Sequence, residues 1–380
     1  MVVEDVRDYI LSKLFFPKVA MIDKPGIIIS KTSAKYGGRE SKKRIIFYFE
    51  DLFANLQSET IKKLGNKKTK DLWYKIGKDV GTRYMLLANV KKPPYFLLPE
   101  IIRYICSALS SAGLSVAKRV IYNKRKELLI LRGENNIMCR KNGFGDVTAG
   151  LFSGIFSYLF GKNFEFKKTR CCYKDDYCEI IGSTIFKKKY IPNHLSLKPA
   201  KDYNRLNFPE KIKYSERFYS FSDFIKFKKI IIDNDEKFNF NNVILIPMEI
   251  GFAGLIYHNY KLTNKENILK KVVVKESKKI AKNLFSDVID KETVEKLNAI
   301  KIKLCALGWG IPYYEIEKEK IIFNFVYPPI NKYGHLFEAW ILNGFLDYLL
   351  KEKCIITNIN IDNKIPIIKI TFKKLMPNLH

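Results

Sequence analysis

The sequence predicts an α+β protein made of two tandem domains, each with helices packed on an antiparallel sheet. Three observations lead to this prediction. Helical stripes alternate with short strand pairs along 380 residues, a length that suits two domains. Apolar residues make up 47% of the chain, which is enough for a folded core. The order helix, strand pair, helix, strand pair occurs twice, which indicates a duplicated domain.

The first copy is expected over residues 44–182, after an N-terminal extension at 1–43. Apolar residues recur at four-residue steps over 70–90, and this spacing predicts a helix. Gly77 and Gly81 lie one turn apart in this helix. Because glycine has no side chain, the pair predicts close packing against a second helix.

Two further helices and two strand pairs complete the first copy. Helices are expected over 98–113 and 146–161, because each apolar run ends at a glycine. Two or three strands are expected over 114–141, and a strand pair over 164–182. The turn of the second pair carries cysteines, so candidate metal-binding residues are expected there.

A second, degenerate copy is expected over 241–380. Its helices are predicted within 274–310 and over 335–353. The segment 153–162 can be overlaid on 343–352, which matches Gly154 with Gly344 and Tyr158 with Tyr348. The overlay supports duplication, although the shared order of elements is the stronger argument.

The segment 183–240 joins the two copies and is predicted to be a basic, aromatic arm. Between 183 and 229 it holds 12 Lys and Arg against 4 Asp and Glu. The whole chain has a net charge of +29, which favours polyanionic partners. Lysines that neutralise phosphates release counterions, and aromatic rings stack on bases. We therefore expect a nucleic acid or ribonucleoprotein partner, contacted by Lys187, Lys188, Lys189, Arg205, Arg217, Lys226, Lys228 and Lys229.

Two stretches of the first copy resemble the 4-vinyl-reductase-like domain family. GLFSGIFSYLFGKNFEFKKTRCCYKDDYCEIIG at 150–182 is similar to the signature half of that domain, and WYKIGKDVGTRY at 73–84 is similar to its paired-glycine helix. The resemblance covers about residues 44–182 and extends more weakly over about 268–372. It implies a fold related to TRAPP vesicle-tethering subunits and a buried pocket for small apolar molecules. In aromatic-sensing transcriptional activators such domains serve as sensors.

The resemblance also implies a zinc ion, held by three cysteines and a glutamate. In this sequence Lys168 occupies the place of the glutamate, and an ammonium group cannot bind a metal. The spacing of Cys171 and Cys178 is one residue shorter than in the family. The remaining cysteine is expected near Gly145, and Cys139 is the nearest substitute.

A zinc site in the first copy can nevertheless be assembled from cysteines alone. Four thiolates could bind the ion tetrahedrally. The alternative is that some of these thiols are buried as small apolar groups and the others are incidental. The candidate metal ligands are Cys139, Cys171, Cys172 and Cys178.

A ligand pocket in the first copy is expected along the 146–161 helix and the strand that follows it. Pockets for small molecules are mostly apolar, and large aromatic residues recur here at helical spacing. The same pattern fits side chains that simply fill the core. The candidate pocket residues are Phe152, Ile155, Phe156, Leu159, Phe160, Phe164 and Phe166.

No catalytic motif is recognisable, so we expect a non-enzymatic binding and regulatory protein. The chain has only four histidines and lacks a nucleophile elbow, a phosphate-binding glycine loop and a dinucleotide fingerprint. One alternative is a TRAPP-like scaffold that forms a homodimer. Another, suggested only by the family name, is a metal-dependent enzyme of tetrapyrrole or aromatic metabolism.

The location of the protein is expected to be the cytoplasm. Seven cysteines are an odd number, so a secreted disulfide framework is not expected. No apolar run reaches the roughly 18 residues that a membrane span requires. The acidic N-terminus lacks the cleavage site of a signal peptide.

Overall fold

The computed structural model shows an α+β protein whose chain divides into two compact units. The first unit comprises residues 1–22, 29–43 and 64–208, and the second comprises 23–28, 44–63 and 209–380. The structure describes residues 19–32, 41–87, 98, 101–102, 105–106, 115–123, 125–189, 217–233, 237–329, 335–362 and 367–375.

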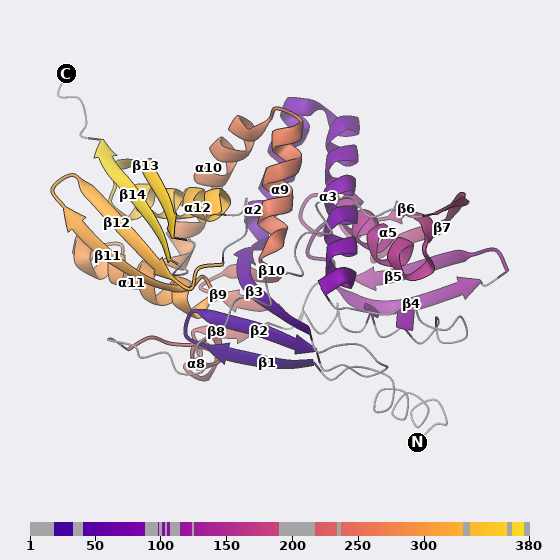
Figure 1. Ribbon diagram of the computed structural model, residues 1–380, viewed down its shortest axis with the longest axis horizontal. Helices are drawn as coiled ribbons and strands as arrows, with labels where there is room; N and C mark the ends of the chain where they lie inside the picture. The colour runs from indigo at the N-terminus through magenta and orange to yellow at the C-terminus, as the bar shows by residue number, and fades with distance from the viewer. Residues whose placement is uncertain are drawn as a thin grey trace. The chain divides into compact units, whose positions relative to one another are not determined.

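The first unit contains a four-stranded antiparallel sheet with strand order β4-β5-β7-β6. Helix α5 packs on β6 and against helix α3 (Figure 1). The elements in chain order are α3 (Asn66–Leu87), β4 (Val116–Asn123), β5 (Leu128–Glu134), α5 (Asp146–Phe160), β6 (Lys162–Arg170) and β7 (Cys178–Lys189).

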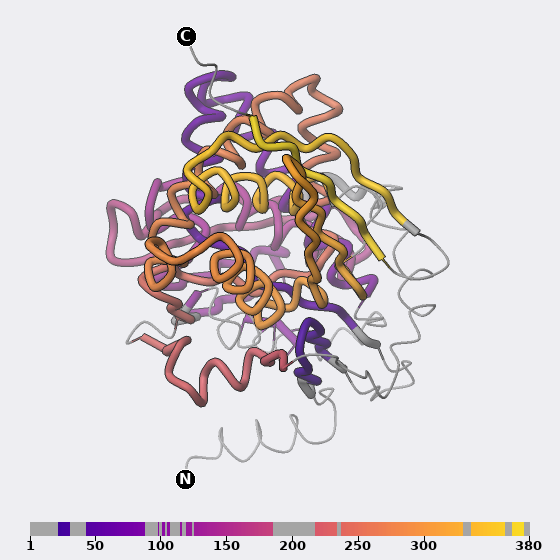
Figure 2. Tube along the Cα trace, turned by 90° about the vertical axis from the view of Figure 1, so that its left-hand side faces the viewer, coloured from indigo at the N-terminus to yellow at the C-terminus, as the bar shows by residue number. Residues whose placement is uncertain are grey.

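The second unit contains a four-stranded antiparallel sheet with strand order β11-β12-β14-β13. Helix α12 lies beside this sheet and packs against α10 (Figures 1 and 2). The elements are α10 (Glu266–Leu284), the 3₁₀ helix η2 (Ser286–Val288), α11 (Thr293–Ala306), β11 (Ile311–Glu317), β12 (Lys320–Val326), α12 (His335–Leu349), β13 (Lys353–Asp362) and β14 (Ile367–Leu375).

A further sheet has the strand order β1-β2-β3-β10-β9-β8. Its strands β3 and β10 pair antiparallel, with Leu245 opposite Phe49, although almost 200 residues separate them in sequence. The remaining elements are β1 (Val19–Lys24), β2 (Ile27–Thr32), β3 (Ser41–Phe49), α2 (Glu50–Leu64), α8 (Phe221–Lys226), β8 (Ile230–Ile232), β9 (Phe238–Phe240), β10 (Val243–Glu249) and α9 (Gly251–Leu262).

The two units repeat one topology, as the order of sequence elements predicted. Each has a helix, a hairpin, a second helix and a second hairpin, and in each the first hairpin's second strand pairs with the last strand. The overlaid glycines have equivalent places. A Cβ atom at Gly154 of α5 would lie 2.1 Å from the carbonyl oxygen of Lys78 in α3. A Cβ atom at Gly344 of α12 would lie 2.5 Å from the carbonyl oxygen of Val274 in α10.

Glycines also bring α3 and α5 into backbone contact, which confirms the close packing predicted from Gly77 and Gly81. A Cβ atom at Gly77 would lie 2.1 Å from the carbonyl oxygen of Val147. At Gly81 the corresponding distance to the carbonyl oxygen of Leu151 is 2.0 Å. No side chain fits at such distances, so the glycines define where the two helices cross.

The boundaries of the units differ from the predicted domains. Residues 44–63 belong to the second unit because β3 pairs with β10, a contact that local sequence patterns do not reveal. Strand β7 continues past residue 182 to Lys189.

The predicted arm at 183–240 also contains regular structure. Residues 217–240 include α8, β8 and β9, and Phe221 of α8 is buried and stacks on Phe47 with ring centroids 4.0 Å apart. Within residues 217–240, Phe218, Phe221, Phe224 and Phe240 are buried and belong to a folded core, whereas Phe227 is exposed. Residues 190–216 of the predicted arm lie outside the described residues.

Among the described helices, none is both long enough and apolar enough to cross a membrane.

Candidate metal centre

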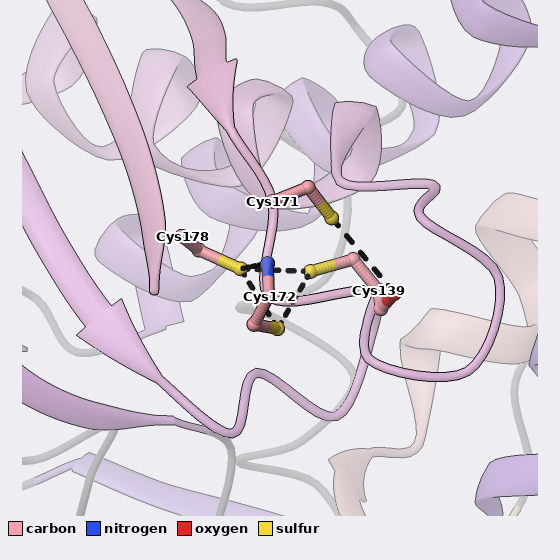
Figure 3. A group of neighbouring side chains, drawn as sticks. All are labelled: Cys139, Cys171, Cys172 and Cys178. Atoms are coloured by element: carbon pink, nitrogen blue, oxygen red, sulfur yellow. Dashed lines mark hydrogen bonds between the residues drawn. The ribbon is translucent and has the colours of Figure 1, made fainter. Parts of the chain in front are cut away.

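Four cysteine side chains converge at one end of the first unit's sheet (Figure 3). Cys139 lies on the loop between β5 and α5. Cys171 and Cys172 follow the end of β6, and Cys178 begins β7. Their sulfur atoms all lie within 4.8 Å of one another. The structure thus brings together all four of the predicted metal ligands.

The spacing of the sulfurs suits a metal ion better than disulfides. The Cys139 Sγ–Cys178 Sγ and Cys172 Sγ–Cys178 Sγ distances are both 3.0 Å, and Cys139 Sγ–Cys172 Sγ is 3.6 Å. A disulfide bond is about 2.05 Å long, so these are free thiols. A tetrahedral zinc site with Zn–S bonds of about 2.3 Å has sulfurs about 3.8 Å apart. The sulfur–sulfur distances of the cluster therefore differ from this tetrahedral value by a few tenths of an ångström to about 1 Å.

Backbone hydrogen bonds shape the turn that carries three of the cysteines. The amides of Lys174 and Asp175 both donate to the Cys171 carbonyl at 2.9 Å. The Cys171 amide donates to Asp175 Oδ2 at 3.0 Å. The Cys172 amide donates to Cys178 Sγ at 3.1 Å. An amide directed at sulfur stabilises a thiolate, so the turn is suited to metal binding before any ion arrives.

A second turn places Cys139. Its amide donates to the Asn136 carbonyl at 3.0 Å, and its carbonyl accepts from the Gly143 amide at 2.7 Å. The Asn136 side chain also accepts from the Met138 amide at 3.0 Å. Gly143 has φ of 72°, a conformation that favours glycine. The loop therefore holds the Cys139 sulfur toward the other three.

Burial and mutual contact perturb the thiols. Cys139, Cys171 and Cys178 are buried, and Cys172 is half-buried. A hydrogen bond with the Cys139 thiol is the main cause that lowers the pKa of Cys171. The same contact raises the pKa of Cys139. The four groups thus share their protons, and one thiolate forms more readily than an isolated buried thiol would.

The structure accounts for two departures from the family's zinc pattern. Lys168 turns its ammonium toward the Gly143 carbonyl, at 2.6 Å, and lies 3.8 Å from Asp146 Oδ2. A Cβ atom at Gly145 would lie only 2.8 Å from Lys168 Cδ, so a cysteine there would collide with that side chain. It would also lie 3.7 Å from Cys139 Cβ. Cys139 therefore lies near the position at which the resemblance leads one to expect a cysteine, and Cys172 lies in the same group of sulfurs.

Sequence reasoning missed the two residues that shape these turns, Asn136 and Asp175. Asp175 adjoins Asp176 and Lys174 in the sequence, and such a run of charges is typical of an exposed loop. An Asx residue close to a cysteine in a loop was the available signal, because Asn and Asp side chains fold turns by accepting backbone N–H groups.

The predicted pocket residues also come together, but as a packed group. Phe152, Phe156, Phe164 and Phe166 are buried with their ring centroids 5.2 to 6.1 Å from a neighbour within the group. Phe160 is half-buried and stacks on Phe164 at 5.1 Å. The rest of the predicted set, Ile155 and Leu159, belongs to the same core cluster. These side chains fill the space between α5 and the sheet.

The predicted nucleic-acid residues fall into three groups. Arg205 lies outside the described residues, and Lys187, Lys188 and Lys189 form the end of β7. The other four lie around α8 in the second unit with exposed side chains: Arg217, Lys226, Lys228 and Lys229.

No protein-family model matches the chain, and no curated protein matches it. Among solved structures, it is similar to the phenol-responsive sensory domain of the transcription activator PoxR with phenol. That match has 15% identity and a TM-score of 0.33, and it covers 48% of this chain and 91% of that one. A trafficking protein particle complex subunit 3 from Naegleria fowleri, covalently bound to palmitic acid, has 12% identity and a TM-score of 0.29. That match covers 37% of this chain and 98% of the subunit. Likenesses of this degree establish neither family nor function.

Proposed function

We propose that this chain is a non-enzymatic regulatory protein of the cytoplasm whose first unit is organised by a structural zinc ion. The convergence of Cys139, Cys171, Cys172 and Cys178 carries the proposal. Four soft sulfur ligands are the set that zinc prefers in structural sites. Such a site is closed, because no coordination position is left for water or substrate. The ion would therefore contribute stability rather than reaction chemistry.

The proposed ion would connect two parts of the first unit, the loop before α5 and the turn between β6 and β7. One cysteine precedes α5, and the other three belong to the turn between β6 and β7. The aromatic core residues Phe152 and Phe156 of α5 pack against Phe166 of β6. A small apolar ligand that entered this core would have to separate the rings. Ligand binding would thus shift α5 against the sheet, and a partner with different affinity for the two states would detect it.

The partner in this proposal is a nucleic acid or ribonucleoprotein. Arg217, Lys226, Lys228 and Lys229 expose four positive charges within 13 residues, and Phe227 beside them is 52% exposed. Cations that contact phosphates and an exposed ring that can stack on a base are the two elements of sequence-independent binding to single strands.

Native mass spectrometry of the protein purified from its own cells tests both parts. The spectrum would be recorded before and after nuclease treatment and a high-salt wash, together with metal analysis. We expect one zinc ion per chain to survive the wash and a larger mass to be removed by nuclease. A protein free of metal, with its thiols reduced and unable to take up added zinc, would contradict the metal proposal. A spectrum unchanged by nuclease and salt would contradict the nucleic-acid proposal. A stable dimer without nucleic acid or ligand would favour the scaffold alternative instead.

A further inference from the structure

Strand β8 presents an apolar edge at one end of the six-stranded sheet. It pairs with β9 on one side and is the last strand in the order β1-β2-β3-β10-β9-β8. All three of its residues are isoleucine. Ile230 is buried, whereas Ile231 is 51% exposed and Ile232 is 59% exposed. Because consecutive side chains of a strand point to opposite faces, both faces of the sheet are accessible at this edge.

The register with β9 shows which backbone groups of β8 point outward. The Asp233 amide donates to the Lys237 carbonyl at 2.9 Å, one position beyond the paired strands. In an antiparallel pair, residues with bonds to the partner strand alternate with residues without them, so Ile231 bonds to β9 as Asp233 does. Ile230 and Ile232 therefore direct their N–H and C=O groups away from β9, on the side where no described strand pairs with β8. Such an edge is a template for another strand.

Another edge strand of this chain is protected by charge. Strand β6 ends the first unit's sheet, and five of its nine residues are charged. Charged side chains discourage pairing with a further strand. Strand β8 has no charged residue, and its nearest charges are Lys229 before it and Asp233 after it. Its edge is therefore suited to pairing.

We infer that β8 pairs antiparallel with β8 of a second copy of this chain, about a two-fold axis at Ile231. The segment 229–233, KIIID, is complementary to itself in this register. Lys229 of one copy lies opposite Asp233 of the other, and Ile230 lies opposite Ile232. Opposite charges and β-branched residues that face each other across strands stabilise a sheet. The pairing occupies the β8 edge of both copies, so it is closed at two chains.

The outward-pointing backbone groups fit the same register. Ile230 and Ile232 face each other across the interface, so they form hydrogen-bonded pairs on both sides of the axis. Ile231 and its counterpart form a non-hydrogen-bonded pair, in which Cα atoms are about 4.5 Å apart and side chains are in contact. A register displaced along the strand loses the two pairs of Lys229 and Asp233.

The contact is small, so the dimer is reversible. A stable interface buries about 800 Å² of each partner, which is more than a strand of three residues supplies. We expect a dissociation constant on the order of 10 μM or weaker, unlike the stable dimer of a scaffold. Neither zinc nor nucleic acid is needed for this contact. Lys226 and Lys228 lie outside the paired residues and remain available to the proposed nucleic acid.

The first test is sedimentation equilibrium of the nuclease-treated, full-length protein up to about 1 mM, a concentration well above the expected dissociation constant. Lys229→Glu places a glutamate opposite Asp233, and Asp233→Lys places a lysine opposite Lys229. Each variant alone has like charges at both ends of the pairing, so its dimer should be about tenfold weaker than the wild type. An equimolar mixture of the two variants has opposite charges at both ends. It should form a heterodimer within about threefold of the wild-type affinity.

The second test is disulfide cross-linking of Ile231→Cys, with Ile232→Cys as the matched exposed control and the wild type as the background. Disulfides form between Cα atoms about 4.4–6.8 Å apart. Residues 231 of the two copies meet this condition, whereas residues 232 lie diagonally, at about 7–8 Å or more. Under mild oxidation with diamide, only Ile231→Cys should give a dimer whose 231–231 disulfide is found by peptide mapping.

Four results would overturn the inference. They are a wild type that stays monomeric at about 1 mM, self-association that nuclease abolishes, equal cross-linking of the two cysteine variants, and a charge-variant mixture no tighter than either variant alone. Nuclease sensitivity would show that nucleic acid joins the copies instead. If a charge variant does not fold, the cysteine variants still decide, because they leave Lys229 and Asp233 unchanged.

Discussion

The strongest prediction concerns Cys139, whose removal should release a metal ion and destabilise the first unit. Structural zinc sites contribute apparent binding free energies of about 10–16 kcal/mol. Shared among four thiolates, this is about 3 kcal/mol for each, or about a hundredfold in metal affinity. Cys139→Ala should therefore lose most of its zinc during a chelator wash that leaves the wild type loaded.

The matched control is Cys305→Ala in the second unit. Cys139 and Cys305 are both 1% exposed, so each substitution leaves a cavity of similar size in a buried environment. Only Cys139 has other cysteine sulfurs around it. The two variants separate the loss of a metal ligand from the loss of a buried side chain.

Metal analysis and thiol alkylation provide the two readouts. Of the seven cysteines, four should be protected from alkylation in denaturant when zinc is bound and become reactive after chelation. Cobalt in place of zinc should give the ligand-field spectrum of a tetrahedral thiolate site. Equal metal loss from Cys139→Ala and Cys305→Ala, or alkylation of all seven thiols regardless of zinc, would refute the reasoning.

Three further predictions follow from the structure. Gly77→Ala places a methyl group 2.1 Å from a backbone oxygen, so it should lower the free energy of unfolding, measured in urea, by about 3 kcal/mol or more. The control Lys67→Ala, on the exposed face of α3, should change it by about 0.5 kcal/mol or less. Replacing Lys226, Lys228 and Lys229 with Gln should reduce the slope of log K for single-strand binding against log salt concentration by about 2. The same replacement at the exposed Lys270, Lys271 and Lys275 of α10 should leave this slope nearly unchanged. Because burial raises the pKa of Glu338 in α12 from 4.5 to about 8, the folded state keeps a proton that the unfolded state loses in this range. The free energy of unfolding should therefore fall as pH rises from about 4.5 to 8, by at most on the order of 5 kcal/mol. Glu338→Gln should abolish this fall. A wild type whose free energy of unfolding is constant over this pH range would show that Glu338 is ionised in the folded state.

Local sequence patterns were sufficient for the features that depend on neighbouring residues. The end of α5 at Gly161 is confirmed, since this residue has φ of 65° in a left-handed helix cap. The crossing of α3 and α5 follows from glycines one turn apart, a pattern visible in the sequence alone. The repeated topology could be predicted because the order of helices and strand pairs occurs twice in the sequence.

Features that depend on distant residues could not be predicted in this way. The antiparallel partner of β3 is β10, which lies almost 200 residues along the chain, and no periodicity within β3 identifies it. The same limit applies to Glu338. Its sequence context is an ordinary helix, and it becomes distinctive only when Tyr48 and Trp309 are placed beside it. Similarly, the four cysteines could be named in advance, but their convergence depends on the turns formed by Asn136 and Asp175.

The two units also have hydrogen bonds between helix and strand at equivalent positions. In α5 the Ser153 hydroxyl accepts from the Phe166 amide at 2.8 Å, which joins the helix to the following strand. Asn343 is its equivalent in α12 and donates to the Cys354 carbonyl of β13 at 3.0 Å.

Ser157 and Asp347 form the second equivalent pair. The Ser157 hydroxyl accepts from the Phe164 amide at 2.9 Å, and Asp347 accepts from the Cys354 amide at 2.7 Å. Both units thus join the second helix to the next strand from the same two positions, with different side chains. Such a link constrains the geometry between helix and strand but leaves the rest of each unit free to change. The first unit gathers four thiols at its strand turn, whereas the second buries the carboxyl group of Glu338 on its second helix. Two units of one topology therefore carry different polar groups at different places.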